Sequence, residues 1–150
     1  MKKYILSIVM LASTTTLYAT KDISPRVNFV KQSLDNKLLK IEEYAKVGKA
    51  KKFPYCCAST DSSLLKYTFP NAPQELKEYY DNAKNICYGR LHILALENKL
   101  NTDEKTDCKK IEVTLQINHI KSYLKKSKDM IIWEDFMKKY KDACPDNLNF

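Results

Sequence analysis

Residues 71–100 read NAPQELKEYYDNAKNICYGRLHILALENKL. Asn71, Pro73 and Glu75 are typical of the start of a helix. Apolar side chains then recur every three or four residues, the spacing that places them on one face of an α-helix. They are Leu76, Tyr79, Tyr80, Ala83, Ile86, Cys87, Leu91, Leu94 and Leu100. The stretch predicts a long helix from about residue 73 to residue 99.

A helix of similar length is predicted before it, over residues 25–47. Ser24 supplies the hydroxyl of an N-cap, Pro25 takes the first helical position, and Gly48 ends the pattern. The apolar positions are Val27, Val30, Leu34, Leu38, Ile41 and Ala45. The segment between the two helices is less regular, and there we expect Asp61 to cap one or two turns through Leu64, Leu65 and Tyr67.

Residues 108–150 predict two more helices. The third begins near Cys108 or is capped by Thr114, and its core residues would be Leu115, Ile117, Ile120, Tyr123 and Leu124. Asp129 would cap the fourth, whose apolar stripe is Ile132, Trp133, Phe136, Met137, Tyr140 and Ala143 before Cys144-Pro145. An aromatic stripe at helical spacing is typical of a core.

The fold class follows from these patterns together. The chain has only two glycines and five prolines, and no run alternates apolar with polar residues long enough to indicate a sheet. Short connections favour antiparallel neighbours. The sequence therefore predicts an all-α protein: a small helical bundle, stapled by disulfides, with about four main helices in one domain over residues 20–150.

The first nineteen residues have the order of a secretory signal peptide: a charged start at Lys2 and Lys3, an apolar run, and a small residue at Ala19. The apolar run is well short of the ~20 residues that span a bilayer. We therefore expect cleavage after Ala19, a mature chain that is periplasmic or secreted, and no integral membrane segment after cleavage.

Five cysteines follow, and in an oxidising compartment they indicate disulfides; they are Cys56, Cys57, Cys87, Cys108 and Cys144. If the third and fourth helices form a hairpin, Cys108 and Cys144 lie at the same end and should pair. Cys87 would then pair with Cys56 or with Cys57. The sequence leaves that choice open, and we expect no redox role for the spare thiol.

No catalytic set, metal site or cofactor motif is evident. His92 and His119 both lie in predicted helices, far from a nucleophile in a glycine-bounded turn. Adjacent carboxylates such as Glu42-Glu43 and Glu134-Asp135 diverge by about 100° on a helix and cannot flank one bond. The sequence therefore predicts no catalytic residue, no metal, no cofactor and no enzyme.

The charge of the chain is +8, and +6 remains after the leader is removed, because Lys2 and Lys3 are its only charged side chains. Most lysines are interleaved with acidic residues, which is typical of solvated helix faces. Lys49, Lys51 and Lys52 form one compact cluster. Export argues against a nucleic-acid partner. Because exposed connections carry most recognition surfaces, the predicted contact regions are Lys49–Tyr55 and Asn101–Asp107.

The cysteine-punctuated pattern resembles a known family. It consists of Ile86-Cys87-Tyr88-Gly89-Arg90-Leu91, then Cys108, Val113-Thr114-Leu115-Gln116, Tyr123-Leu124 and Ala143-Cys144-Pro145. This pattern is similar to that of the periplasmic Rap/Tai immunity proteins over residues 83–145. The resemblance implies a small exported helical protein that protects a bacterium against peptidoglycan-amidase effectors delivered by type VI secretion.

The leading hypothesis is therefore an immunity protein that binds a protein partner, a cell-wall amidase, and inhibits it by covering its active site. The alternative is an exported structural or host-interaction protein whose basic helices adhere to acidic surfaces. A redox or chaperone role through Cys56 and Cys57 is a weaker third. Pairing of two copies as a homodimer is compatible with the sequence.

The leader hypothesis predicts the N-terminus of the mature protein. Mass spectrometry of the protein isolated from cells should find Thr20, or a residue within a few positions of it, as the first residue, because signal peptidase cuts after a small side chain. Recovery of the exported protein with Met1 still attached would contradict the leader.

Overall fold

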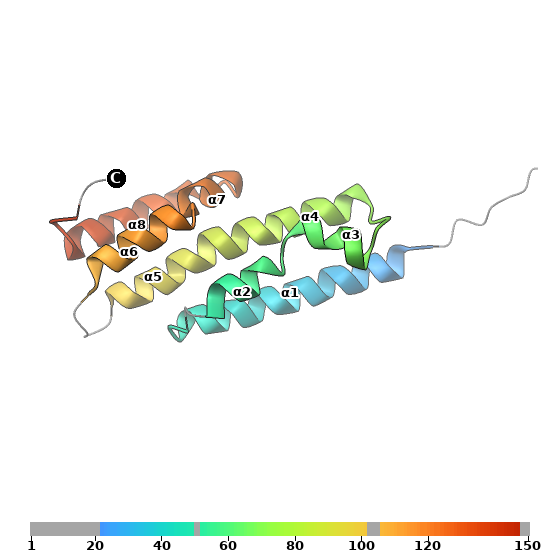
Figure 1. Ribbon diagram of the computed structural model, residues 1–150, viewed down its shortest axis with the longest axis horizontal. Coiled ribbons are helices and arrows are strands. Elements are labelled where there is room, and N and C mark those ends of the chain that lie inside the picture. The colour runs from blue at the N-terminus through green and yellow to red at the C-terminus, as the bar shows by residue number, and fades with distance from the viewer. Residues whose placement is uncertain (1–21, 50–51, 102–105, 148–150) are drawn as a thin grey trace, which may run out of the picture.

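The computed structural model describes residues 22–49, 52–101 and 106–147, and every regular element in these ranges is helical (Figure 1). The all-α prediction is confirmed. None of these helices is both long enough and apolar enough to cross a membrane. The predicted signal peptide, residues 1–19, lies outside the described residues, and so do residues 50–51 and 102–105 of the two predicted contact regions.

The first helix, α1, spans Ser24–Lys46, within a residue of its predicted bounds. Its N-cap is Ile23 rather than Ser24, and no side chain caps it. Gly48 ends it as predicted, with a φ of +69° in the left-handed region that glycine adopts without strain. The buried positions Val27, Leu34, Ile41 and Ala45 all belong to the predicted stripe.

The second long helix is continuous from Gln74 to Leu100 but changes its winding. It comprises α4 (Gln74–Asn85), a π-helical turn η3 (Ile86–Leu91) and α5 (His92–Leu100). The sequence pattern indicated its extent and did not indicate the π turn. Wider turns of this kind are rare and occur mostly as single turns inside α-helices.

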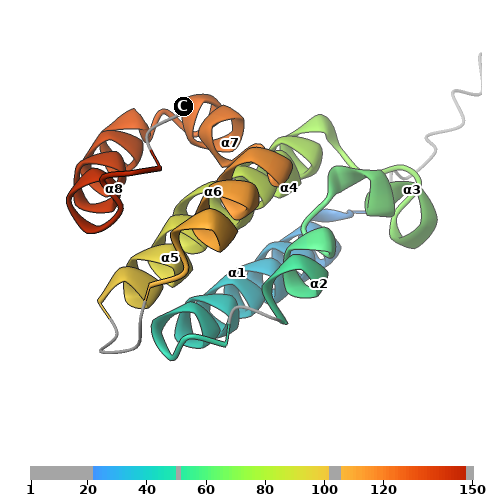
Figure 2. The same ribbon diagram turned by 60° about the vertical axis from the view of Figure 1, so that its left-hand side comes forward.

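The two long helices run in the same direction (Figures 1 and 2). Lys31 pairs with Glu75 near their N-terminal ends, Tyr79 donates to Asp35 at 2.5 Å, and Asn98 caps the C-terminal end of α1 by donating to Ala45 O at 2.6 Å. The expectation of antiparallel neighbours is wrong for this pair. The reason is the irregular segment between them, which is long enough to return the chain to its starting end.

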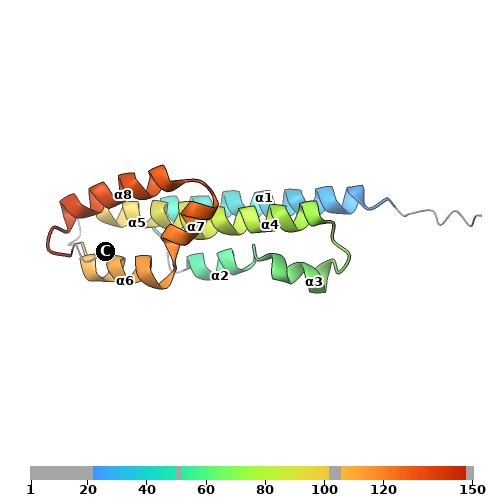
Figure 3. The same cartoon turned by 90° about the horizontal axis from the view of Figure 1, so that it is seen from above.

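That return segment contains three short helices. They are α2 (Phe53–Ala58), the 3₁₀ turn η2 (Ser62–Leu64) and α3 (Leu65–Thr68). Asp61 caps η2 by accepting from Ser63 N at 2.9 Å, as predicted. Figure 3 shows α2 and α3 in a row with α6 on one side of the long helices.

The predicted third helix is broken in two, α6 (Cys108–Ile117) and α7 (Ile120–Lys126). The break occurs at His119, whose φ of +48° is left-handed, so this histidine is not helical as expected. The break also turns Ile117 outward, leaving it 68% exposed instead of in the core.

The fourth predicted helix is α8 (Met130–Ala143). Asp129 stands at its N-cap position but makes no side-chain cap; its carboxylate lies 3.4 Å from Arg90 Nε of η3 instead. Trp133, Phe136 and Tyr140 are buried, as the stripe predicted, and Ala143 is exposed. With α4, η3 and α5 taken as one helix and η2 with α3 as another, the described residues form seven helices rather than about four.

Two disulfides join these elements. Cys57 of α2 bonds Cys87 of η3, and Cys108 at the start of α6 bonds Cys144 at the end of α8. The second is the pair that the hairpin arrangement predicts, and the first leaves Cys56 as the free thiol, a choice the sequence had left open. Each bridge adjoins one of the main core clusters.

The contact between η3 and α7 depends on one glycine. A Cβ on Gly89 would lie 3.1 Å from Leu124 Cδ2 and 3.2 Å from Leu124 N. Tyr88 and Tyr123 stack beside this contact, with their ring centroids 5.1 Å apart. The absence of a side chain at Gly89 therefore allows α7 to reach the π turn.

This contact predicts the sign of a substitution. Gly89→Ala should lower the free energy of unfolding by about 1–3 kcal/mol, because the added methyl overpacks against α7. An unstrained helical glycine would instead gain up to about 1 kcal/mol from the same change. Urea denaturation measures the difference.

Two further variants test the cause. The cost of Gly89→Ala should shrink when Leu124→Ala is also present, since neighbouring substitutions couple. Gly48→Ala, where no atom lies within 4 Å of the added Cβ, should show no such coupling. A stabilising Gly89→Ala would contradict the packing role of Gly89.

Candidate functional site

The first predicted contact region, Lys49–Tyr55, borders a pocket of about 400 Å³, and no described residue of the second region, Asn101–Asp107, lines it. Gly48, Phe53 and Pro54 line it on the side of the first region. Lys99 and Lys110 also line it. In sequence they flank the second region, Lys99 before it and Lys110 after it. We call this hollow the His92 pocket, after the histidine of α5 that also lines it.

His92 is the most unusual side chain in the pocket. It is only 5% exposed and packs against aromatic rings, with its centroid 4.7 Å from that of Phe53 and 5.8 Å from that of Tyr88. Its Nδ1 is buried and has no hydrogen-bond partner among the described residues. Burial lowers the pKa of His92 to about 4, and the nearby charge of Lys99 adds to the effect. The ring is therefore neutral at neutral pH.

The pocket is positively charged on one side. Burial lowers the pKa of Lys99 below its ordinary value, and the positive charge of Lys110 lowers it further, while Asp107 opposes both. Asp107 also caps α6 by accepting from Lys110 N at 3.0 Å. An anionic group in the pocket would reduce the repulsion between Lys99 and Lys110. The chemistry of the His92 pocket thus suits an anion attached to an apolar group.

The disulfides fix both borders of the pocket. Cys57 holds α2, which carries Phe53 and Pro54, against η3. Cys108 holds the start of α6, which carries Lys110, against the end of α8. Fixing the borders before a ligand arrives reduces the ordering cost of binding.

An exposed aromatic side chain stands beside the pocket. Tyr55 of α2 is 83% exposed, whereas Phe53 is buried and faces the core. Lys52, from the predicted basic cluster, lies over the ring of Tyr44 at 5.8 Å. The charges that line the pocket are those of Lys99 and Lys110, which the sequence analysis did not single out, because they are distant in sequence and look like ordinary helix-surface lysines.

The other predicted candidates stay apart from the His92 pocket. His119 is exposed at the break between α6 and α7, and Cys56 is partly buried on α2. Within the described ranges no three His, Cys, Asp or Glu side chains are grouped so that they could hold a metal ion.

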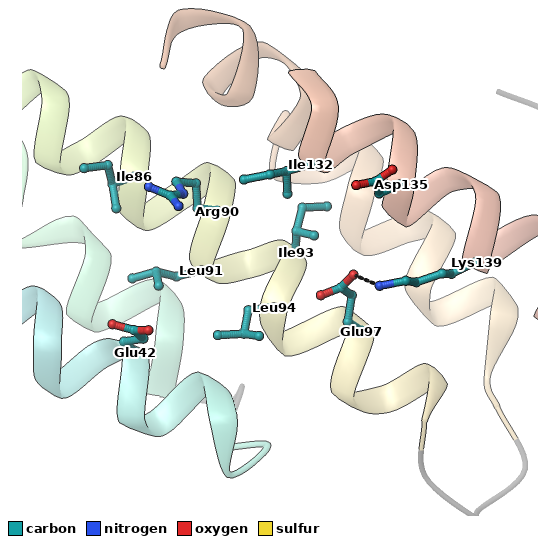
Figure 4. Close-up of a pocket in the computed structure, with 10 residues that line it drawn as sticks. All are labelled: Glu42, Ile86, Arg90, Leu91, Ile93, Leu94, Glu97, Ile132, Asp135 and Lys139. Atoms are coloured by element: carbon teal, nitrogen blue, oxygen red, sulfur yellow. Dashed lines mark hydrogen bonds and ion pairs between the residues drawn. The ribbon is translucent and has the colours of Figure 1, made fainter. Parts of the chain in front are cut away.

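The carboxylates Glu42 and Asp135 line a second hollow, on the side where α1, α5 and α8 meet (Figure 4). Its volume is about 370 Å³, and Leu91 and Leu94 lie between its charged groups. Lys139 Nζ contacts Glu97 at 2.7 Å, and Glu42 pairs with Lys46 at 3.1 Å. Most of its charges thus have partners of opposite sign nearby.

Comparison with known proteins adds no relative. No family model matches the chain, and no curated protein or solved structure is significantly similar to it. The resemblance to the Rap/Tai immunity proteins therefore stays a prediction.

The burial of His92 predicts a pH dependence of stability. Its pKa of about 4 in the folded protein lies below the ordinary 6.5, so between these values the unfolded chain takes up a proton that the folded chain does not. Stability should therefore fall as pH drops below 6.5. His92→Phe should reduce the stability difference between pH 7 and pH 5 by about 2 kcal/mol.

His119→Asn is the matched control, because it removes the exposed histidine and keeps a residue that tolerates a left-handed φ. Guanidinium denaturation at both pH values should show the wild-type slope in this variant. An unchanged slope in His92→Phe, or an imidazole of His92 that titrates near 6.5 by NMR, would contradict the buried neutral state.

Proposed function

We propose that this chain is an exported binding protein that inhibits a partner enzyme by covering its active site, and that the His92 pocket with Tyr55 is its contact surface. The observation that carries the proposal is that two segments about fifty residues apart in sequence border one basic pocket, with each border tied down by its own disulfide. Occlusion needs a rigid surface with a few strong anchors and requires no chemistry from the inhibitor.

The chemistry of the pocket indicates what the partner presents. An acidic side chain could enter between Lys99 and Lys110, while its apolar neighbours pack on Phe53 and Pro54. Tyr55 would add a large contact area outside the pocket at low entropic cost, as aromatic anchors do at interfaces. The net positive charge of the chain would mainly raise the association rate with an acidic partner.

The identity of the partner as a peptidoglycan amidase rests on the resemblance alone. Several of the residues that carry it have structural roles here: Gly89 packs against α7, and Cys108 bonds Cys144. Such residues stabilise the fold and are not part of the proposed contact surface. For an immunity protein the partner to test is the product of the neighbouring gene, since toxin and immunity genes sit side by side.

Coexpression tests the proposal. The mature domain, directed to the periplasm together with the neighbouring gene product, should restore survival and form an isolable complex. Lys110→Glu should weaken the complex at least tenfold, because it reverses the charge beside the expected acidic anchor. Tyr55→Ala should also weaken it at least tenfold, which corresponds to about 1.4 kcal/mol.

The chain offers a matched control for each variant. Lys109→Glu makes the same charge change on the adjacent, exposed position of α6, and Tyr67→Ala removes a tyrosine of α3 that is also largely exposed. Both controls should bind like the wild type in calorimetric titration. Unchanged killing with no detectable complex would reject the inhibitor and leave the adhesive alternative. Equal losses in variants and controls would reject the His92 pocket as the contact.

A further inference from the structure

A third hollow lies at the other end of α6, between α6, α7 and the start of α8, and has a volume of about 530 Å³. Its apolar lining comes from Leu115, Met130 and Trp133, of which Leu115 and Trp133 are buried. Lys121 and Lys125 of α7 line it as well. We call it the Trp133 groove. Its size falls in the range of about 300–1,000 Å³ typical of small-molecule sites.

The charge around this groove has one sign. Residues 119–128 read HIKSYLKKSK, with four lysines and no acidic residue. Within the described part of the chain neither Lys121 nor Lys125 makes an ion pair. The next carboxylate along the chain, that of Asp129, faces Arg90 Nε at 3.4 Å. The lysines at the groove therefore lack a compensating negative charge from their own segment.

The two lysines share one face of α7. They are four residues apart, so their side chains are neighbours, and like charges at this spacing destabilise a helix. The Nζ of Lys121 lies 5.6 Å from the centroid of the Trp133 ring. The adjoining face of α7 carries Leu124, which packs on Gly89 of η3 and is fully buried. Packing on the core thus directs both charges toward the groove.

We propose that the Trp133 groove binds an anionic amphiphile: its hydrocarbon part packs against Leu115, Met130 and Trp133, and its phosphate or carboxylate lies between Lys121 and Lys125. An inorganic anion would make no contact with the apolar side chains of the groove. A neutral hydrocarbon would leave Lys121 and Lys125 without a counterion. The site is separate from the His92 pocket, and this proposal is independent of the proposed function.

Trp133 provides a direct probe, because it is the only tryptophan in the chain. The mature protein is titrated with dodecyl phosphate below its critical micelle concentration while the tryptophan emission is recorded. We expect a saturable change that weakens as salt is added, because salt screens the contact with exposed lysines. Dodecyl maltoside has the chain without the charge, and inorganic phosphate the charge without the chain; each should bind at least tenfold more weakly.

A double variant tests the two lysines. Lys121→Gln with Lys125→Gln should weaken dodecyl phosphate binding at least tenfold. Lys138→Gln with Lys141→Gln is the control, since it removes the same charge from exposed positions of α8 that do not line the groove. Circular dichroism checks that both proteins are folded.

Three results would overturn the proposal. Equal affinity for dodecyl maltoside would show a hydrophobic contact alone. Equal weakening in the control double variant would show an effect of net charge. A response to vesicles of anionic phospholipid, with none to monomeric dodecyl phosphate, would show docking on a membrane surface instead of a site for one amphiphile.

Discussion

The close approach of α7 to the π turn η3 is the contact on which the rest of the fold depends. It occurs at Gly89, where a methyl group would lie 3.1 Å from the side chain of Leu124. Two residues earlier in the same helix, Cys87 is bonded to Cys57 and holds α2 on η3. The long helix therefore contacts α2, from the N-terminal half of the fold, at Cys87, and α7, from the C-terminal half, at Gly89.

This junction also determines where the charged surfaces lie. His92 follows the π turn directly, so the winding of η3 directs its ring toward Phe53 and Tyr88, in a desolvated position. The disulfides then hold α2 and α6 on either side of it, across loops of 30 and 36 residues, each worth about 3–4 kcal/mol in the loop-entropy estimate. For a small domain this is a large share of total stability. The stability that the disulfides contribute therefore offsets the cost of burying His92 without a hydrogen-bond partner for Nδ1. It also offsets the repulsion between Lys99 and Lys110 at the same pocket.

The sequence predicted what depends on local periodicity and missed what depends on tertiary contact. The bounds of α1 and α8, the cap at Asp61 and the pairing of Cys108 with Cys144 followed from spacing and from the few residue types able to fill those roles. The parallel course of the long helices did not follow, because the path of the return segment is set by packing. The π turn and the break at His119 did not follow either, because neither has a signature in the apolar spacing of the sequence. The His92 pocket joins residues from three distant segments, and only its border at Phe53 and Pro54 belongs to a contact region that the sequence predicted.

The central claim is that the His92 pocket is the surface that a partner covers. Hydrogen–deuterium exchange of the complex, compared with that of the free mature protein, tests this most directly, since it reports protection along the whole chain without substitutions. The account predicts that protection on binding is greatest in α2, at the end of α5 and in the first two turns of α6, around Tyr55, Lys99 and Lys110. Protection confined to α1, α7 or α8, with these three segments unchanged, would contradict it.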